Sequence, residues 1–196
     1  MKIVEVAVLA YGMGSIPFSL LVAMYHRVDL FKVGSGNLGA TNVLRALGWK
    51  WGLLVFLLDA LKGYIPTMLI LSSSTNPWIH IGVGLLAVVG HSYSIFAKFK
   101  GGKGVATGIG ILLALSPDVA VIVLGGALLG IALTRYVAPF SILGSVVTPV
   151  LLWVKNYADA YVVCTAIIAM MIIWRHKDNI KRLCTGQENR MSLWKK

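Results

Sequence analysis

The chain has 196 residues, of which 58% are hydrophobic and only 13% are charged, and its formal net charge is +11. Soluble domains carry about 25% charged residues, so this composition excludes an ordinary soluble protein and indicates an integral membrane protein. A single domain over 1–196 is expected at this length. The two cysteines, Cys164 and Cys184, lack metal-ligand spacing, and we expect no disulfide between them.

Apolar runs follow one another along the chain, with polar segments between most of them. The first run begins at residue 3 and has no small-residue cleavage pattern, so we expect a retained helix and not a signal peptide. The run that begins at residue 105 is short, because about eleven helical residues cover only about 16 Å of a hydrocarbon core of about 30 Å. The predicted spans are 3–25, 51–71, 78–97, 105–116, 118–134, 138–154 and 159–174.

The distribution of cationic residues favours a membrane crossing by the short run as well. With seven spans, Lys2 and Lys155 lie on one side and Lys62 lies inside a span. Every other Lys and Arg, including Lys195 and Lys196, then lies on the opposite side. Cytoplasmic segments are enriched in Lys and Arg. These residues therefore predict an all-α integral membrane protein, a bundle of seven transmembrane helices with the N-terminus outside and the C-terminus in the cytoplasm.

The first concentrated polar segment is Gly34-Ser-Gly-Asn-Leu-Gly-Ala-Thr-Asn-Val-Leu-Arg45. Glycine lets the backbone approach a ligand closely, and the N-terminus of a following helix offers free N–H groups to an anion. A flexible connector before a short helix is the alternative interpretation, but a connector does not need hydroxyl, amide and guanidinium groups together. The segment predicts a phosphate site. Its expected ligands are Ser35, Asn37, Thr41 and Arg45.

A second glycine-rich segment, Gly101-Gly-Lys-Gly104, lies in a basic loop after the third predicted span. It does not match the nucleotide-binding pattern G-x-x-x-x-G-K-[ST], but a glycine nest with a lysine still forms an anion site. The alternative interpretation is a loop that is basic only because cytoplasmic segments are enriched in Lys and Arg. His91 precedes this loop, and it is equally consistent with substrate binding and with a core histidine that is hydrogen-bonded between helices. The expected phosphate ligands are Gly101, Gly102, Lys103 and Gly104, with His91.

A third polar segment follows the last predicted span and contains Arg175, His176, Asn179, Gly186 and Glu188. A positive stop-transfer tail is the alternative interpretation, but that role needs neither the imidazole nor the amide and carboxylate groups. Like charge from neighbouring cations disfavours protonation of His176. A neutral His176 could accept or relay a proton near neutral pH.

Asp59 and Lys62 lie three positions apart inside the second predicted span. Side chains at this spacing share one helix face, and charges inside a membrane usually pair and face the bundle interior. We expect a mutual ion pair that supports the site without reacting. His26 and His80 are expected to be interfacial and structural.

Together, the three polar segments resemble the cytoplasmic motifs of the bacterial acyl-phosphate:glycerol-3-phosphate acyltransferases, the PlsY type, and Asp59-Ala-Leu-Lys62-Gly63 is similar to that family as well. The similarity covers nearly the whole chain, in order and in spacing. It implies an enzyme of the bacterial inner membrane, with its active site at the cytoplasmic face. This enzyme would transfer a fatty acyl group from acyl phosphate to the 1-hydroxyl of sn-glycerol 3-phosphate. The products would be lysophosphatidic acid and phosphate, in the first step of phospholipid synthesis.

The resemblance also implies roles for individual residues. Glycines 101, 102 and 104 would bind glycerol 3-phosphate, and Glu188 would be structural. The chain departs from the family at Ser94, where proline is expected, and around Ala138-Pro139, where a serine-rich segment is expected; Ser141 is the substrate-binding candidate there. We expect a monomer in the lipid bilayer, with acyl phosphate and glycerol 3-phosphate as ligands and without a metal, a cofactor or a nucleic-acid partner. The residues that the resemblance makes catalytic are Ser35, Arg45, His176 and Asn179.

Two features of the mechanism stay open at this point. The H-x-x-x-x-D pair of soluble-type glycerolipid acyltransferases is missing, because Phe96 stands five residues after His91 and Lys181 stands five residues after His176. The base is therefore either His176 or the departing phosphate. Ser35 is either a phosphate ligand or a nucleophile.

Two other classes of membrane protein compete with the acyltransferase. A small-anion or phosphate transporter would bind at mid-membrane on broken helices, whereas the polar motifs here are predicted at one interface. A lipid kinase would need a carboxylate cluster for Mg²⁺, and none is expected on the basic face.

Overall fold

The computed structural model describes residues 2–191, so Lys195 and Lys196 of the basic tail lie outside the described residues. Every regular element within that range is a helix. The elements are α1 (Ile3–Ser15), α2 (Phe18–Tyr25), α3 (Ala40–Leu47), α4 (Trp49–Leu71), α5 (Pro77–Ser92), the 3-10 helix η1 (Ile95–Ala97), α6 (Val105–Leu115), α7 (Pro117–Thr134), α8 (Ala138–Val154), α9 (Asp159–Arg175) and α10 (Lys177–Cys184).

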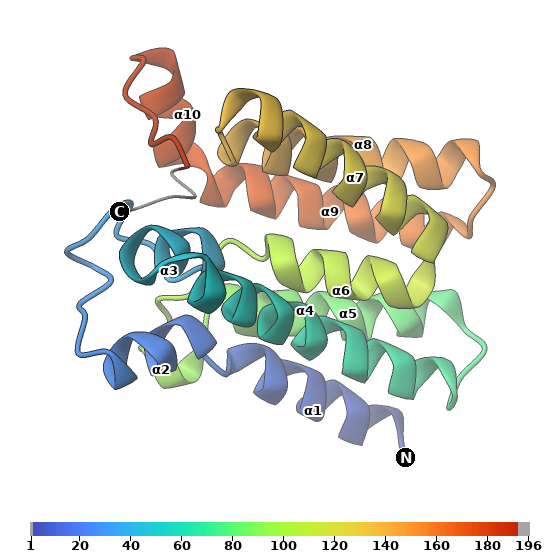
Figure 1. The fold of residues 1–196 in the computed structure, drawn as a ribbon. Helices are drawn as coiled ribbons and strands as arrows, with labels where there is room; N and C mark the ends of the chain where they lie inside the picture. Colours follow the sequence, from blue (N-terminus) through green and yellow to red (C-terminus); the bar gives the residue numbers. More distant parts are fainter. Residues whose placement is uncertain (1, 192–196) are drawn as a thin grey trace.

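The long helices lie side by side with similar axis directions, as Figure 1 shows for α1 and for α4 to α9. Helices α2, α3 and α10 gather at one end of this bundle, and the N-terminus and the turns after α4 and α8 lie at the other end. We call the first the motif end, which comprises residues 26–47, 98–104 and 175–191. We call the second the far end, which comprises residues 72–76, 115–118 and 155–161.

Within residues 2–191, four helical segments are long and apolar enough to cross a membrane, namely Ile3–Tyr25, Trp49–Leu71, Pro77–Ala97 and Pro117–Thr134. A fifth candidate is α9 together with α10, which are bent by 57° at their junction. Helices α6 and α8 are apolar but shorter. Each of the predicted spans therefore corresponds to an apolar helical segment, although length and composition alone support only four or five crossings.

Proline shapes two of the helix boundaries. The first predicted span is broken between α1 and α2 at Pro17, which has no N–H group to continue the helix. The Lys62 ammonium donates to the carbonyl of Ile16 at this break, over 3.0 Å. Pro117 is the first residue of α7, where a missing N–H group costs nothing. The chain therefore ends α6 at Leu115 and begins α7 two residues later.

Glycine allows α4 and α6 to pack closely. A Cβ atom at Gly110 would collide with the backbone of Ala60, and a Cβ atom at Gly63 would collide with the Thr107 carbonyl. Small residues at such positions let two helix backbones approach each other. This contact brings the start of α6, with the glycine-rich loop before it, next to the middle of α4.

The helix expected after the first glycine-rich segment is α3, which begins inside the motif at Ala40 and ends at Leu47. A helix of eight residues is marginal alone and depends on packing. Leu38 and Val43 are buried in a hydrophobic cluster with Val55 of α4. Ser94, at the position where proline was expected, caps η1 by accepting from the Ala97 N–H group and also donates to the Ser15 carbonyl.

Candidate active site

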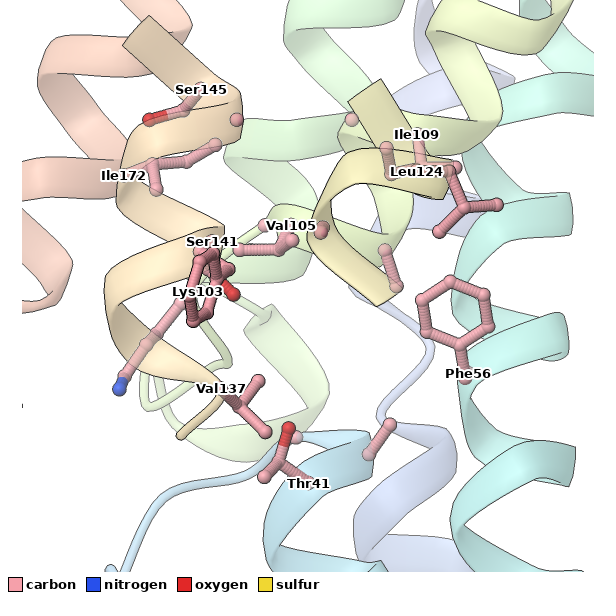
Figure 2. Close-up of a pocket in the computed structure, with 18 of the residues that line it drawn as sticks. Thr41, Phe56, Lys103, Val105, Ile109, Leu124, Val137, Ser141, Ser145 and Ile172 are labelled. Atoms are coloured by element: carbon pink, nitrogen blue, oxygen red, sulfur yellow. The ribbon is translucent and has the colours of Figure 1, made fainter. Parts of the chain in front are cut away.

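One cavity of about 520 Å³ connects the motif end with the far end, between α3, α4 and α6 to α9. Figure 2 shows Thr41 of α3, Lys103 of the glycine-rich loop and Ser141 of α8 lying around it. The three polar segments therefore meet around one space. The predicted site residues that line it are Ser35, Asn37, Thr41, Arg45, Asp59, His91, Lys103, Gly104, Ser141, His176, Asn179 and Glu188.

Asn42 organises the first polar segment from inside. Its side chain is 1% exposed, and its amide group donates to the carbonyls of Leu30 and Val33, over 3.0 and 3.1 Å. Its amide oxygen accepts from the Ser35 N–H group, over 2.9 Å. Asn42 thus fixes where Ser35 lies at the cavity wall. Asn42 belongs to the first polar motif but was not among its expected phosphate ligands.

Arg45 extends from α3 toward the segment after α10. Its Nη2 group donates to the Asn189 carbonyl over 2.9 Å. The Nε group of Arg45 is buried and has no hydrogen-bond partner among the residues that the structure describes. Burial lowers the pKa of the guanidinium. An oxyanion in the cavity would supply the missing partner and would stabilise the buried charge.

The peptide groups of Gly101 and Gly102 are paired within the protein. Their N–H groups donate to the carbonyls of Ser92 and His91, over 3.2 and 3.1 Å. Their carbonyl groups accept from Arg175, over 2.6 Å at Gly101 and 3.0 Å at Gly102. Neither glycine lines the large cavity. Their predicted contact with phosphate stays a prediction, and the structure instead gives them a packing role that fixes the loop before Lys103.

Arg175 was named in the sequence only as the start of the third polar segment. In the structure its guanidinium holds both glycine carbonyls and lies over the Tyr93 ring, with 5.5 Å between Cζ and the ring centroid. A methyl group at Gly102 would collide with the His91 ring. Arg175 and His91 therefore hold the glycine-rich loop between them.

A hydrogen-bonded chain joins this loop to the C-terminal segment. The Lys103 ammonium donates to the Asn179 side-chain oxygen. The Asn179 amide group donates to one carboxylate oxygen of Glu188 over 2.8 Å, and Arg182 donates to the other over 2.9 Å. Glu188 thus has contacts that match its predicted structural role. Burial is the main cause that lowers the pKa of Lys103 to about 8.

His176 lies just beyond the end of α9 and is 3% exposed. Its Nδ1 atom is 2.8 Å from the Ile172 carbonyl. Because a carbonyl only accepts, Nδ1 carries the proton and Nε2 is left with a lone pair. Burial, followed by the charge of Lys103, lowers the pKa of His176 to about 4. The imidazole is therefore neutral near pH 7.

Asp59 and Lys62 form the predicted ion pair, with 2.8 Å between Oδ1 and Nζ and both side chains 3% exposed. The Nδ1 atom of His91 lies 3.7 Å from the same Asp59 oxygen. Asp59 and His91 also border the large cavity, whereas Lys62 does not. The three residues form a buried polar layer behind the site, and the supporting role of the ion pair stays a prediction.

The rest of the cavity wall is mostly apolar, with a few hydroxyl side chains such as Ser145, Thr148 and Thr165. Figure 2 shows Phe56, Val105, Ile109, Leu124 and Val137 around the space that leads away from Thr41 and Lys103. A ligand in this cavity can therefore place a charged group at the motif end and the rest of its length among hydrocarbon side chains.

Comparisons with known proteins agree with this arrangement. The family model described as glycerol-3-phosphate acyltransferase matches residues 4–186. A glycerol-3-phosphate acyltransferase of Aquifex aeolicus is 45% identical over 97% of this chain and 100% of its own length. One from Thermus thermophilus is 46% identical over 93% of this chain and 92% of its own length.

Two solved structures are similar over nearly the whole chain. Both are crystal structures of PlsY, an integral membrane glycerol 3-phosphate acyltransferase. The glycerol 3-phosphate form has a TM-score of 0.93 and 43% identity, and the lysophosphatidic acid form has a TM-score of 0.90 and 41% identity. Each match covers 97% of this chain and 96% of the other. By sequence and by fold, the chain belongs to the glycerol-3-phosphate acyltransferase family of integral membrane proteins.

Proposed function

We propose that this protein transfers a fatty acyl group from acyl phosphate to the 1-hydroxyl of sn-glycerol 3-phosphate, giving lysophosphatidic acid and phosphate. The observation that carries the proposal is the single cavity with two kinds of wall. Cationic and hydrogen-bonding groups line it at the motif end, and apolar groups line it toward the far end. Both substrates carry phosphate and one also carries an acyl chain, so the cavity matches their chemistry.

Phosphate binding is assigned to the side chains that line the motif end. Arg45 offers a permanently charged guanidinium with one unpaired buried donor among residues 2–191. Lys103 supplies a second positive charge, and the Ser35 hydroxyl lies at the same wall. Asn37, Thr41 and Ser141 are proposed as further polar contacts.

The reaction needs one proton transfer. The 1-hydroxyl oxygen attacks the acyl carbonyl carbon, and the bond from that carbon to the phosphate oxygen breaks. The phosphate leaves with the bonding electron pair, and the hydroxyl proton goes to His176 or to the phosphate. Burial and the charge of Lys103 lower the pKa of His176 to about 4, so the departing phosphate, which is more basic, is the better final acceptor.

In this mechanism the protein mainly positions the two substrates and neutralises the charge of their phosphate groups. Acyl phosphate already has a good leaving group, so a covalent serine intermediate is unnecessary. We therefore assign Ser35 to phosphate binding, and we assign His176 and Asn179 to orienting the acceptor. A covalent acyl-serine trapped from a single turnover would overturn the assignment of Ser35.

The direct test is phosphate release by purified protein with palmitoyl phosphate, with and without glycerol 3-phosphate, and with palmitoyl-CoA in parallel. We expect release that requires glycerol 3-phosphate and no turnover of the thioester. Release without the acceptor would indicate a phosphatase or an acyl-enzyme. Turnover of the thioester would overturn the proposed donor.

The transporter alternative makes a different prediction for the same protein in vesicles. A transporter would take up radiolabelled phosphate without forming lysophosphatidic acid. Uptake without chemistry, together with no phosphate release in the assay above, would favour that class. The polar groups meet at one end of the helix bundle and not at its middle, which supports the enzyme.

The membrane topology that we propose has seven spans, with the N-terminus outside and the C-terminus in the cytoplasm of a bacterial inner membrane. Its support is the gathering of cationic segments at the motif end, while Lys2 and Lys155 belong to the other end. Cys184 is exposed at the motif end and Cys164 is buried. A membrane-impermeant maleimide should therefore label Cys184 in inverted vesicles only. Labelling in sealed right-side-out vesicles would contradict this orientation, and a Cys184→Ser variant is the control.

We further propose that residues 1–196 act as one domain and as a monomer. All the site side chains described above come from one chain, so a second copy is not needed to complete the cavity. Light scattering of the detergent-solubilised protein, measured together with its activity, would test this. Activity that appears only in a dimer fraction would contradict it.

A further inference from the structure

The cavity ends at the far end of the bundle against Tyr161 of α9. Leu115, Ser116 and Leu152 line this same end. Tyr161 and Leu152 are 9% and 1% exposed, and Ser116 is completely buried. Along α9, fifteen residues separate Tyr161 from His176, which corresponds to about 22 Å of helix.

The hydroxyl groups near this end are satisfied by their own helices. Thr165 donates to the Tyr161 carbonyl over 2.6 Å, Thr148 donates to the Gly144 carbonyl over 2.8 Å, and Ser116 is 3.4 Å from the Leu112 carbonyl. Such groups offer little to a polar ligand. The end of the cavity is therefore suited to a hydrocarbon terminus.

Tyr161 is held in place by a buried partner. Its hydroxyl lies 2.9 Å from Nδ1 of His80, and Nε2 of His80 lies 2.7 Å from the Ser74 carbonyl. The carbonyl accepts only, so Nε2 carries the proton and Nδ1 accepts from Tyr161. His80 is 5% exposed. Moving the Tyr161 ring would leave buried polar groups unpaired, which is unfavourable.

The elements behind Tyr161 are also joined to one another. Tyr157 donates to one carboxylate oxygen of Asp118 over 2.5 Å, and Lys155 pairs with the other over 2.8 Å. These contacts connect the start of α7 with the turn between α8 and α9. The turn that precedes Tyr161 is therefore tied to the start of α7 by side-chain contacts at the surface.

We propose that Tyr161, positioned by His80, is the stop that sets the longest acyl chain the enzyme uses. This inference rests on the proposed acyl transfer. An extended acyl chain advances about 1.3 Å per carbon–carbon bond, given a bond length of about 1.5 Å. The distance of about 22 Å along α9 then accommodates on the order of 17 carbons.

The test compares rates for lauroyl, myristoyl, palmitoyl, stearoyl, arachidoyl and behenoyl phosphate with the full-length enzyme. We expect the native protein to use palmitoyl and stearoyl donors and to lose about tenfold or more at arachidoyl phosphate. Tyr161→Ala should restore the arachidoyl rate to within a few-fold of the palmitoyl rate. Tyr161→Phe keeps the ring but loses the hydrogen bond to His80, so its profile should broaden toward longer donors, by less than that of Tyr161→Ala.

Three further variants distinguish a steric stop at Tyr161 from a general loosening of the helix packing. Thr165 lies one turn closer to the motif end on the same helix face. Thr165→Leu should shift the preferred donor toward lauroyl and myristoyl phosphate, opposite to the shift for Tyr161→Ala. His80→Ala should broaden the profile toward longer donors. Cys164→Ala also changes a buried α9 residue, but Cys164 does not line the cavity, so its profile should match the native one.

The outcomes distinguish this inference from the proposed function. A native enzyme that uses no acyl phosphate at all would overturn the function. A native enzyme that is active, together with active Tyr161→Ala and Thr165→Leu variants of unchanged chain-length profile, would overturn the stop alone. If Tyr161→Ala does not fold, the chain-length profiles of Thr165→Leu and His80→Ala still decide whether Tyr161 limits the acyl chain.

Discussion

The two ends of the cavity satisfy their polar groups in different ways. At the motif end, the buried polar groups pair across elements that are distant in sequence, as Arg175 does with the Gly101 carbonyl and Lys103 does with Asn179. Toward the far end, the hydroxyls of Thr148 and Thr165 donate to carbonyls one turn back in their own helices, and Tyr161, which pairs with His80 of another helix, is the exception along the cavity. Networks between elements fix side chains that can also meet a ligand. Hydroxyls satisfied within a helix leave a wall that behaves as apolar.

The largest expected effect comes from removing the unpaired charge at the motif end. Arg45→Ala should lower kcat/KM for glycerol 3-phosphate by about 100- to 1000-fold, because one charged donor to the reacting group is lost. The measurement is phosphate release with palmitoyl phosphate as donor. Lys50→Ala, at an exposed residue outside the cavity, is the control and should be neutral. An unchanged kcat/KM for Arg45→Ala would mean that the motif end binds its anion without this residue.

The next effect tests whether packing at the motif end positions Lys103. Gly102→Ala would push the loop away from the His91 ring. A displacement of about 1 Å at a reacting site costs about 100-fold, so activity per folded molecule should fall by about that factor. Gly82→Ala is the matched control, since a methyl group there meets open space. Equal activities of the two variants would contradict a positioning role for the loop.

The pH profile separates the charged end from the apolar end. The pKa of Lys103 is lowered to about 8, so its ammonium loses its proton as the pH rises through about 8. If the charged form binds phosphate, kcat/KM should fall about tenfold per pH unit above that value. Lys103→Arg should remove this alkaline limb because arginine stays protonated. An alkaline limb that persists in Lys103→Arg would assign it to another group.

The smallest effect is expected at Glu188, which supports the motif end from outside the reaction. Glu188→Gln keeps the acceptor for Asn179 but removes the charge facing Arg182, which is 26% exposed in its side chain. We expect a loss of about 1 kcal/mol in stability, since the pair is partly exposed, and a fall in Tm of about 2–4 °C. Activity should fall only a few-fold. Glu5→Gln, at an exposed residue of α1, is the control. A Tm unchanged from the native protein would show that Glu188 does not stabilise this segment.

Helix positions could largely be predicted from the sequence. The predicted span 118–134 is α7 with one residue added, and the predicted span 51–71 is α4 with two residues added. Long apolar runs dominate the local energetics in a membrane, so tertiary contacts have little freedom to change them. A helix after the first polar segment was expected without bounds, and α10 was not predicted, because eight residues do not specify a stable helix alone.

The types of residue at the candidate site could be predicted from the sequence. The hydrogen-bond partners of those residues were harder to predict. The three polar segments were expected to share one face, and the structure brings them around one cavity. The pairing of both glycine N–H groups with the end of α5 was not expected. The hydrogen bonds from Arg175 to both glycine carbonyls were not expected either. A cation at the end of a span is already explained by the enrichment of cytoplasmic segments in Lys and Arg.

By itself, the sequence determined the apolar spans, the concentration of cations on particular segments and the kinds of side chain available to bind phosphate. Those properties are local, and they follow from periodicity and composition. Only the tertiary structure decided which groups meet. Lys103 pairs with Asn179 and His80 pairs with Tyr161, in each case from helices or loops far apart in the chain. Close helix packing fixes such contacts, and no local pattern encodes the partner.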